Sequence, residues 1–134
     1  MEHSLELMRD AKTIAVVGVS ADPTRPSNDV AKYLIDAGYE VYLVNPTEQE
    51  IFGQPVYASL ADVPVAVDIV DIFRRPGDVP PVVDAAIEAG AKAVWMQLGI
   101  VNEEAAATAR AAGLEVVMDR CTKIEHRQLQ MLGG

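Results

Sequence analysis

The chain has 134 residues, of which 20 are acidic and 11 basic, so its formal net charge is −9. This length fits one domain over residues 1–134, and a chain of that size buries enough surface to fold without a metal or disulfide. The negative charge excludes a nucleic-acid or anionic lipid surface, and at first sight it argues against any anionic ligand.

The N-terminal segment and the cysteine count bear on the compartment. The first residues, MEHSLELMRDAK, lack the basic start and apolar run of a secretory signal, and no apolar run approaches the ~18 residues of a membrane span. The single cysteine, Cys121, cannot form an internal disulfide. We therefore expect a cytoplasmic protein with no membrane partner.

Apolar runs of strand length alternate with helical patterns along almost the whole chain. The first run is β-branched and nearly uninterrupted, as is typical of a parallel strand covered on both faces. Ser27–Asp29 supply N-cap residues for the helix that follows, and Gly38 ends it. In chain order we predict strands over residues 13–19, 40–44, 55–57 (a short edge strand), 67–73, 93–98 and 114–118.

The second half of the chain continues the alternation. Asp78 is predicted to cap a helix that runs to Ala89, and Asn102 opens an alanine-rich helix. A short helix over 124–131 ends the pattern. Such βαβ alternation predicts an α/β fold with a doubly wound parallel sheet of five to six strands and helices on both faces.

In an open parallel sheet, ligands bind beyond the carboxyl ends of the strands. Five of the eleven basic residues lie on loops that leave such ends, namely Arg25, Arg74, Arg75, Arg120 and Lys123. Guanidinium groups pair with phosphate oxygens in a bidentate way, so this cluster predicts a local anion site on an acidic protein. The alternative is that the loops simply carry solvated charges.

The loop after the first strand is short of glycine. It runs from Gly18 through Val19 and Ser20 to Ser27, and it lacks both the Gly-x-Gly-x-x-Gly fingerprint and the Gly-x-x-x-x-Gly-Lys-Ser/Thr loop. It nevertheless leads into a helix N-terminus, where free N–H groups favour phosphate. A plain strand-to-helix turn with a capping serine is the alternative interpretation.

Other strand ends carry weaker signals. The second strand ends in Asn45-Pro46, where a dinucleotide-binding enzyme would usually have Asp or Glu, which counts against a dehydrogenase. Phe73 could contact an adenine face or form the rim of the core. Gln97 follows Trp95 and Met96, which we expect in the core, and its polar side chain needs a partner in a loop or a ligand.

Catalytic candidates are few. His3 and His126 belong to no readable triad or metal set. Asp68 and Asp71 alternate with apolar residues in one strand, which indicates a less buried sheet face there rather than an acid–base pair. Cys121 follows Arg120 and is either a small buried hydrophobe or an exposed thiol. No reaction is specified.

Five segments together resemble the small stand-alone CoA-binding domain proteins, which are similar in turn to the N-terminal CoA-binding domain of the succinyl-CoA synthetase α subunit. The resemblance covers about residues 11–129. The segments are AVVGVS with RPS, VNP, VDIFRRP, WMQLG and MDRC.

The resemblance implies a Rossmann-like domain that binds coenzyme A at the carboxyl edge of the sheet. The first loop (Gly18, Val19, Ser20, Arg25 and Ser27) would hold phosphates, and Asn45 and Pro46 would line the adenosine end. Ile72, Phe73 and Arg74 would flank adenine and the nucleotide, with Arg75 nearby for charge, and Gln97 and Gly99 would lie along the pantetheine arm.

The departures from the synthetase limit what the resemblance implies. The chain lacks the second domain of the synthetase, which carries the phosphorylated histidine. Its first loop also lacks the extra glycine of the synthetase pattern. We therefore expect a protein that binds CoA or an acyl-CoA without self-sufficient catalysis, with an acyl-CoA enzyme as a candidate partner. The alternatives are an NAD(P)-binding enzyme or redox regulator on the same fold, and a Cys121 thiol that forms a mixed disulfide with CoA.

Overall fold

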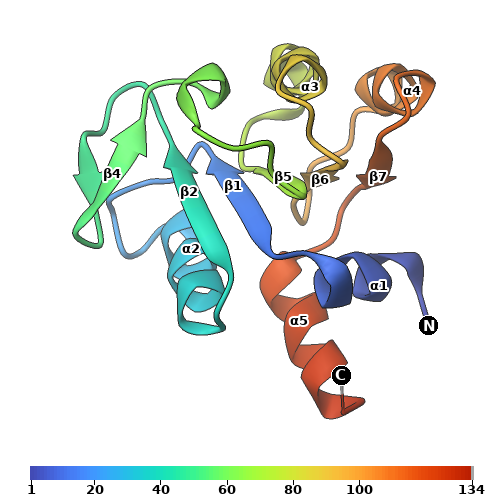
Figure 1. The fold of residues 1–134 in the computed structure, drawn as a ribbon, viewed down its shortest axis with the longest axis horizontal. Coiled ribbons are helices and arrows are strands. Elements are labelled where there is room, and N and C mark those ends of the chain that lie inside the picture. Colours follow the sequence, from blue (N-terminus) through green and yellow to red (C-terminus); the bar gives the residue numbers. More distant parts are fainter. Residues whose placement is uncertain (134) are drawn as a thin grey trace.

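The computed structural model describes residues 1–133, and its strands form one sheet in the order β3-β4-β2-β1-β5-β6-β7 (Figure 1). All neighbours pair in parallel except β3 and β4, which are antiparallel. The strands are β1 (Thr13–Val17), β2 (Glu40–Val44), β3 (Glu50–Ile51), β4 (Gln54–Tyr57), β5 (Ile69–Ile72), β6 (Ala93–Met96) and β7 (Glu115–Val117). This is the Rossmann-like α/β fold that the sequence predicts.

The predicted count of five to six strands is wrong, because residues 1–133 form seven. The additional strand is β3, which has two residues and pairs with β4 across a tight turn. Both central residues of that turn, Phe52 and Gly53, have positive φ, at 58° and 73°. Such a turn matches the twist of a hairpin, and it places a small antiparallel extension on the β2 edge of the parallel sheet.

Helices cover both faces of the sheet, as predicted. Figure 1 shows α3 and α4 on one face and α1, α2 and α5 on the other. The helices are α1 (His3–Asp10), α2 (Pro26–Asp36), α3 (Val79–Glu88), α4 (Glu103–Ala111) and α5 (Thr122–Met131), with short 3-10 turns at η1 (Leu60–Asp62) and η2 (Pro76–Asp78). Within residues 1–133, none of these helices combines the length and the apolar character that crossing a bilayer requires.

The central strand β1 divides the core into two layers. Ala15 and Val17 pack toward α3 and α4, while Ile14 and Val16 pack toward α1, α2 and α5. All four side chains are buried, which explains why the first run of the sequence is apolar at successive positions rather than at alternate ones. The carboxyl end of β1 therefore lies at the centre of a rigid sheet edge.

The expectation of a less buried sheet face at β5 is wrong. Asp71 is fully buried on the α5 side of the sheet, with Val16 and Trp95 as its neighbours across the sheet. Two polar side chains, Gln97 directly after β6 and Thr122 of α5, reach its carboxylate, which removes the need for solvent. Asp68 precedes β5 and accepts hydrogen bonds from the backbone N–H groups of Lys12 and Thr13.

Candidate functional site

A cavity of about 670 Å³ lies at the carboxyl ends of β1, β5 and β6. Its volume is within the range typical of small-molecule sites, and its position follows the rule for open parallel sheets. The lining residues are Gly18, Ser20, Arg25, Pro26, Ser27, Val30, Phe73, Arg74, Arg75, Gln97, Leu98, Ile100 and Cys121. Eight of these residues belong to the thirteen candidates that the sequence nominates.

The first loop is fastened to the start of α2 by two hydrogen bonds. The Ser20 backbone N–H donates to Oγ of Ser27 at 2.9 Å, and Nδ2 of Asn28 donates to the Ser20 carbonyl oxygen at 2.9 Å. Helix α2 begins at Pro26, so Ser27 lies inside the helix and is not its N-cap, contrary to the sequence-based prediction. Arg25 occupies that position without a side-chain cap, and Pro26 opens the helix, where its missing N–H is no loss.

Three arginines approach the cavity from two loops. Arg25 and Arg74 form no salt bridge and no side-chain hydrogen bond within residues 1–133, although Arg25 lies near enough to Asp22 to lower the pKa of that carboxyl slightly. The larger causes of that lowered pKa are two hydrogen bonds from Thr24. Arg75 is paired with Asp78 at 3.1 Å on the exposed surface. Unpaired guanidinium groups beside a helix N-terminus make this part of the cavity suited to phosphate.

The predicted cluster of five cations is only partly correct. Arg120 does not line the cavity and lies 3.6 Å from carboxylate oxygens of both Glu2 and Glu125. Lys123 is paired with Asp29 of α2 at 2.8 Å. These two cations are thus paired within the protein, which leaves Arg25 and Arg74 as the unpaired arginines of the cavity beside the paired Arg75.

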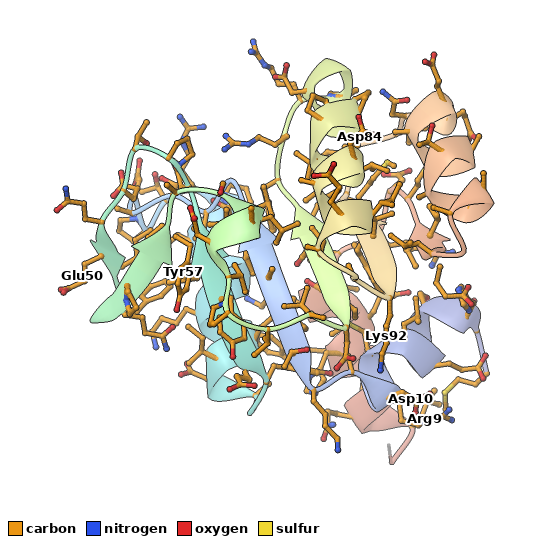
Figure 2. All side chains as sticks on the ribbon, turned by 45° about the horizontal axis from the view of Figure 1, so that its top comes forward. Arg9, Asp10, Glu50, Tyr57, Asp84 and Lys92 are labelled. Carbon is orange, nitrogen blue, oxygen red and sulfur yellow. The ribbon has the colours of Figure 1, made fainter. Side chains whose placement is uncertain are left out.

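Two cations at the opposite end of the sheet, Arg9 and Lys92, are also paired with carboxylates. Figure 2 shows Arg9 beside Asp10 at the end of α1 and Lys92 just before β6. Arg9 contacts Asp10 at 2.8 Å, which raises the Arg9 pKa and lowers the Asp10 pKa, mainly through the side-chain hydrogen bond between them. Lys92 lies 3.2 Å from Asp68.

The remaining cavity wall is largely uncharged. Phe73 is partly exposed at the end of β5, Leu98 and Ile100 follow β6, and Cys121 is partly buried at the N-cap position of α5. Four lining residues, Pro26, Val30, Leu98 and Ile100, are not predictable as site residues from the sequence, because apolar residues at element ends look like core residues. The prediction that Trp95 and Met96 are core residues is confirmed, since both are fully buried.

Gln97 is one of two buried polar residues of the cavity, at 3% exposure beside 6% for Ser27. Its Nε2 donates to Oδ1 of Asp71 at 2.7 Å and to Oγ1 of Thr122 at 2.9 Å, and Oγ1 of Thr122 donates to Oδ2 of Asp71 at 2.9 Å. Burial raises the pKa of Asp71 to about 7, and the hydrogen bonds from Gln97 and Thr122 oppose this rise. The polar partners expected for the Gln97 side chain are therefore Asp71 and Thr122, inside the protein.

Five candidates lie outside the cavity lining. Val19 and Ile72 are fully buried in the core layers. Asn45 anchors the first loop, since its Nδ2 donates to the Val19 carbonyl oxygen at 2.7 Å. Pro46 is exposed, and Gly99 donates its N–H to Asp119 at 2.6 Å. A ligand contact for any of these five stays a prediction.

A second hollow, of about 480 Å³, lies at the opposite edge, where β1 and β2 begin. His126, one of its lining residues, contacts Tyr33 through a 2.8 Å hydrogen bond at Nδ1, and burial lowers its pKa. His3 contacts Glu115 instead. We take the cavity at the carboxyl edge as the candidate site because its unpaired arginines and its position both favour a ligand.

The chain is similar to a protein-family model and to several known proteins over most of its length. Residues 12–127 match the family model described as CoA binding domain. The Bacillus subtilis protein YneT is 42% identical over 121 residues, with 90% of each chain covered. A solved structure of a hypothetical protein from Pyrococcus horikoshii superposes with a TM-score of 0.91 at 42% identity, covering 95% of this chain and 89% of that one.

A third relative is the α subunit of the ADP-forming acetate–CoA ligase I of Pyrococcus furiosus. It is 33% identical over 130 residues that cover 85% of this chain. The match spans only 28% of the ligase subunit, so it concerns one part of that protein.

Proposed function

Since the chain belongs to the CoA binding domain family, we propose that it binds coenzyme A or an acyl-CoA in the cavity at the carboxyl ends of β1, β5 and β6. The observation that carries this proposal is the pair of unpaired arginines, Arg25 and Arg74, beside the start of α2. CoA bears a diphosphate and a 3′-phosphate, so it needs such cations on a protein whose net charge is −9.

The phosphate end of the ligand would lie against the first loop and the α2 N-terminus. Arg25 and Arg74 would pair with phosphate oxygens, and Oγ of Ser20 and the N–H groups of the first turn add donors. Phe73 offers its ring to the adenine. Charge-assisted hydrogen bonds of this kind contribute roughly 1.5–3 kcal/mol each.

The other end of the cavity suits the pantetheine arm. Gln97 supplies one polar group among Leu98, Ile100 and Cys121. An uncharged wall with a single polar group matches a flexible arm that has apolar segments between amides. An acyl group on the sulfur would meet the same wall, so both CoA and acyl-CoA are compatible with it.

The proposal does not extend to ligase chemistry. The ligase relative matches this chain over 28% of its own length, and its activity belongs to the whole protein. We propose a CoA-binding protein without self-sufficient catalysis that works as a carrier or sensor, or beside an acyl-CoA enzyme.

A thermal-shift series tests the proposal. CoA, acetyl-CoA, dephospho-CoA, NAD and NADP are added separately at equal concentration, and the Tm is compared with that of the free protein. We expect CoA or acetyl-CoA to give the largest rise. Stabilisation by NAD or NADP, with none by the CoA compounds, would replace the proposal with the dinucleotide alternative.

A further inference from the structure

Asp71, Gln97 and Thr122 form a closed hydrogen-bond network beneath the cavity floor. Asp71 and Thr122 are fully buried, and Gln97 is nearly so. An ionised carboxylate only accepts hydrogen bonds, so it requires the amide NH₂ of Gln97 and the hydroxyl of Thr122 to point toward it. The network therefore fixes which end of the Gln97 amide faces inward.

The other end of the amide is available to a ligand. Both protons of Nε2 are used by Asp71 and Thr122, and Oε1 accepts no hydrogen bond from residues 1–133. No unpaired polar side-chain atom of these residues is fully enclosed, so Oε1 is accessible from the cavity that Gln97 lines. A nearly buried carbonyl oxygen without a donor stabilises a ligand that brings one.

No cation neutralises Asp71 within the described chain, where its neighbours across the sheet, Val16 and Trp95, are uncharged. Three charged or titratable side chains of α5 on the same side of the sheet have other partners. Glu125 accepts a hydrogen bond from Ser4 and lies near Arg120. His126 is hydrogen-bonded to Tyr33, and Lys123 forms a salt bridge with Asp29. The titratable residues of α1 are exposed, and the charges facing the cavity are Arg25, Arg74 and Arg75. Burial is the largest influence on the Asp71 pKa, which it raises to about 7.

We propose that Asp71 is a positioning residue that orients the Gln97 amide, so that Oε1 accepts a hydrogen bond from an N–H of the pantetheine arm. The inference rests on the proposed function and adds how the site recognises the arm. The pantetheine is assigned because Leu98 and Ile100 follow Gln97 in the chain and Cys121 precedes its partner Thr122. Of the arginines, Arg25 belongs to the first loop and Nε of Arg74 lies 3.4 Å from the position of a Cβ at Gly18. Adenine, which also carries an N–H donor, is the competing occupant that the test separates.

The protonation of Asp71 then controls the site. A protonated carboxyl donates a hydrogen, and in the proposed protonated state it donates to Oε1 of a turned Gln97 amide, whose NH₂ then faces the cavity. The ionised form presents the acceptor. Affinity for a donor group therefore rises as the pH increases through about 7.

Isothermal calorimetry from pH 5.5 to 8.5 tests this with CoA and with the methyl ester of adenosine 3′-phosphate 5′-diphosphate, which lacks the pantetheine arm but carries the same ionisable phosphates. Phosphate ionisation affects both ligands, so their affinity ratio isolates the arm. In the wild type we expect the CoA-to-fragment ratio to increase roughly three- to tenfold across this range, since one hydrogen bond is gained. In Asp71→Asn the ratio should be flat, and Thr122→Ser, which keeps the hydroxyl, should behave like the wild type.

Each other outcome has a distinct meaning. No binding of CoA at any pH overturns the proposed function and this inference with it. Normal CoA binding with the same pH dependence in Asp71→Asn overturns the inference alone. A pH effect that is equal for CoA and the fragment in the wild type, and that is smaller for both in Asp71→Asn, assigns Oε1 to adenine instead of the arm. If Asp71→Asn does not fold, the wild-type ratio and the NMR signals of the Gln97 side-chain amide decide the matter. Those signals should titrate with a midpoint near pH 7, and their failure to move would contradict the proposal.

Discussion

Gly18 lies against the backbone of Phe73, so that a Cβ at position 18 would overlap the Phe73 carbonyl oxygen. Gly18 has φ of 90°, and its N–H donates to the carbonyl oxygen of Val44 at 2.9 Å. The Phe73 N–H donates in turn to the Val17 carbonyl oxygen at 2.9 Å. The ends of β1, β2 and β5 are thereby joined at the cavity floor, and only glycine permits the approach.

Substitution of this glycine should be strongly destabilising. Gly18→Ala combines a left-handed backbone, which costs an alanine about 1–2 kcal/mol, with the overlap at Phe73. The matched control is Gly113→Ala, where φ is 88° and nothing lies within 4 Å of the added carbon. We expect Gly18→Ala to lose about 1–3 kcal/mol more unfolding free energy than the control in urea denaturation. Equal losses in the two variants would refute the close contact.

Removal of the Arg74 guanidinium should weaken ligand binding without unfolding the protein. Arg74 forms no salt bridge within residues 1–133, so its loss leaves no buried carboxylate behind. Arg74→Ala should weaken CoA about ten- to a hundredfold in calorimetry, with little change in Tm. The exposed Arg110, at the end of α4, serves as the control substitution. If Arg74→Ala and Arg110→Ala bind CoA alike, Arg74 is not a ligand contact.

Asp71 should also make the protein less stable as the pH rises. Its pKa is about 7 in the folded protein and 3.8 when solvated, so the folded state holds an extra proton between these values. The unfolding free energy contributed by Asp71 is fully present below pH 3.8 and declines up to about pH 7, by at most about 1.4 kcal/mol per pH unit. The difference between wild type and Asp71→Asn, measured by denaturation at pH 5 and pH 7, should shift in this direction. A difference that is constant with pH would show that Asp71 is not buried as described.

His126 should respond to acid in the opposite sense. Burial lowers its pKa below the usual 6.5, so the folded protein disfavours the charged ring. Its contribution to stability is present above pH 6.5 and is lost as the pH falls through the lowered value. An NMR titration of the ring protons should give a midpoint below 6.5, and a midpoint above 6.5 would contradict the packing of His126 beside Tyr33 and Tyr39.

Elements with a long or distinctive local sequence pattern could be predicted, and the shortest strand could not. The run at β1 and the Gly38 and Gly113 helix ends are local features, and they place strands and helices correctly. The hairpin strand β3 was missed because two residues carry no periodicity and its turn, Phe52-Gly53, is not one of the usual hairpin pairs.

Site residues could be predicted where they follow the carboxyl end of a strand. They could not be predicted where a side chain's role depends on a partner far away in the sequence. That rule nominated Gly18, Arg74 and Gln97, all of which line the cavity. Asp71 was misjudged because Thr122, which bonds it, lies 51 positions away. Arg120 was misjudged for the same reason, since the carboxylate of Glu2 comes from the other end of the chain.

The most direct test of CoA binding in this cavity is an NMR map of backbone amide shifts during a titration with CoA. We expect the largest changes at Ser20, Phe73 and Gln97, around the cavity at the carboxyl ends of β1, β5 and β6. Changes centred on Tyr39 and Leu129, which line the hollow at the opposite edge, would contradict it, as would the absence of any change at saturating CoA.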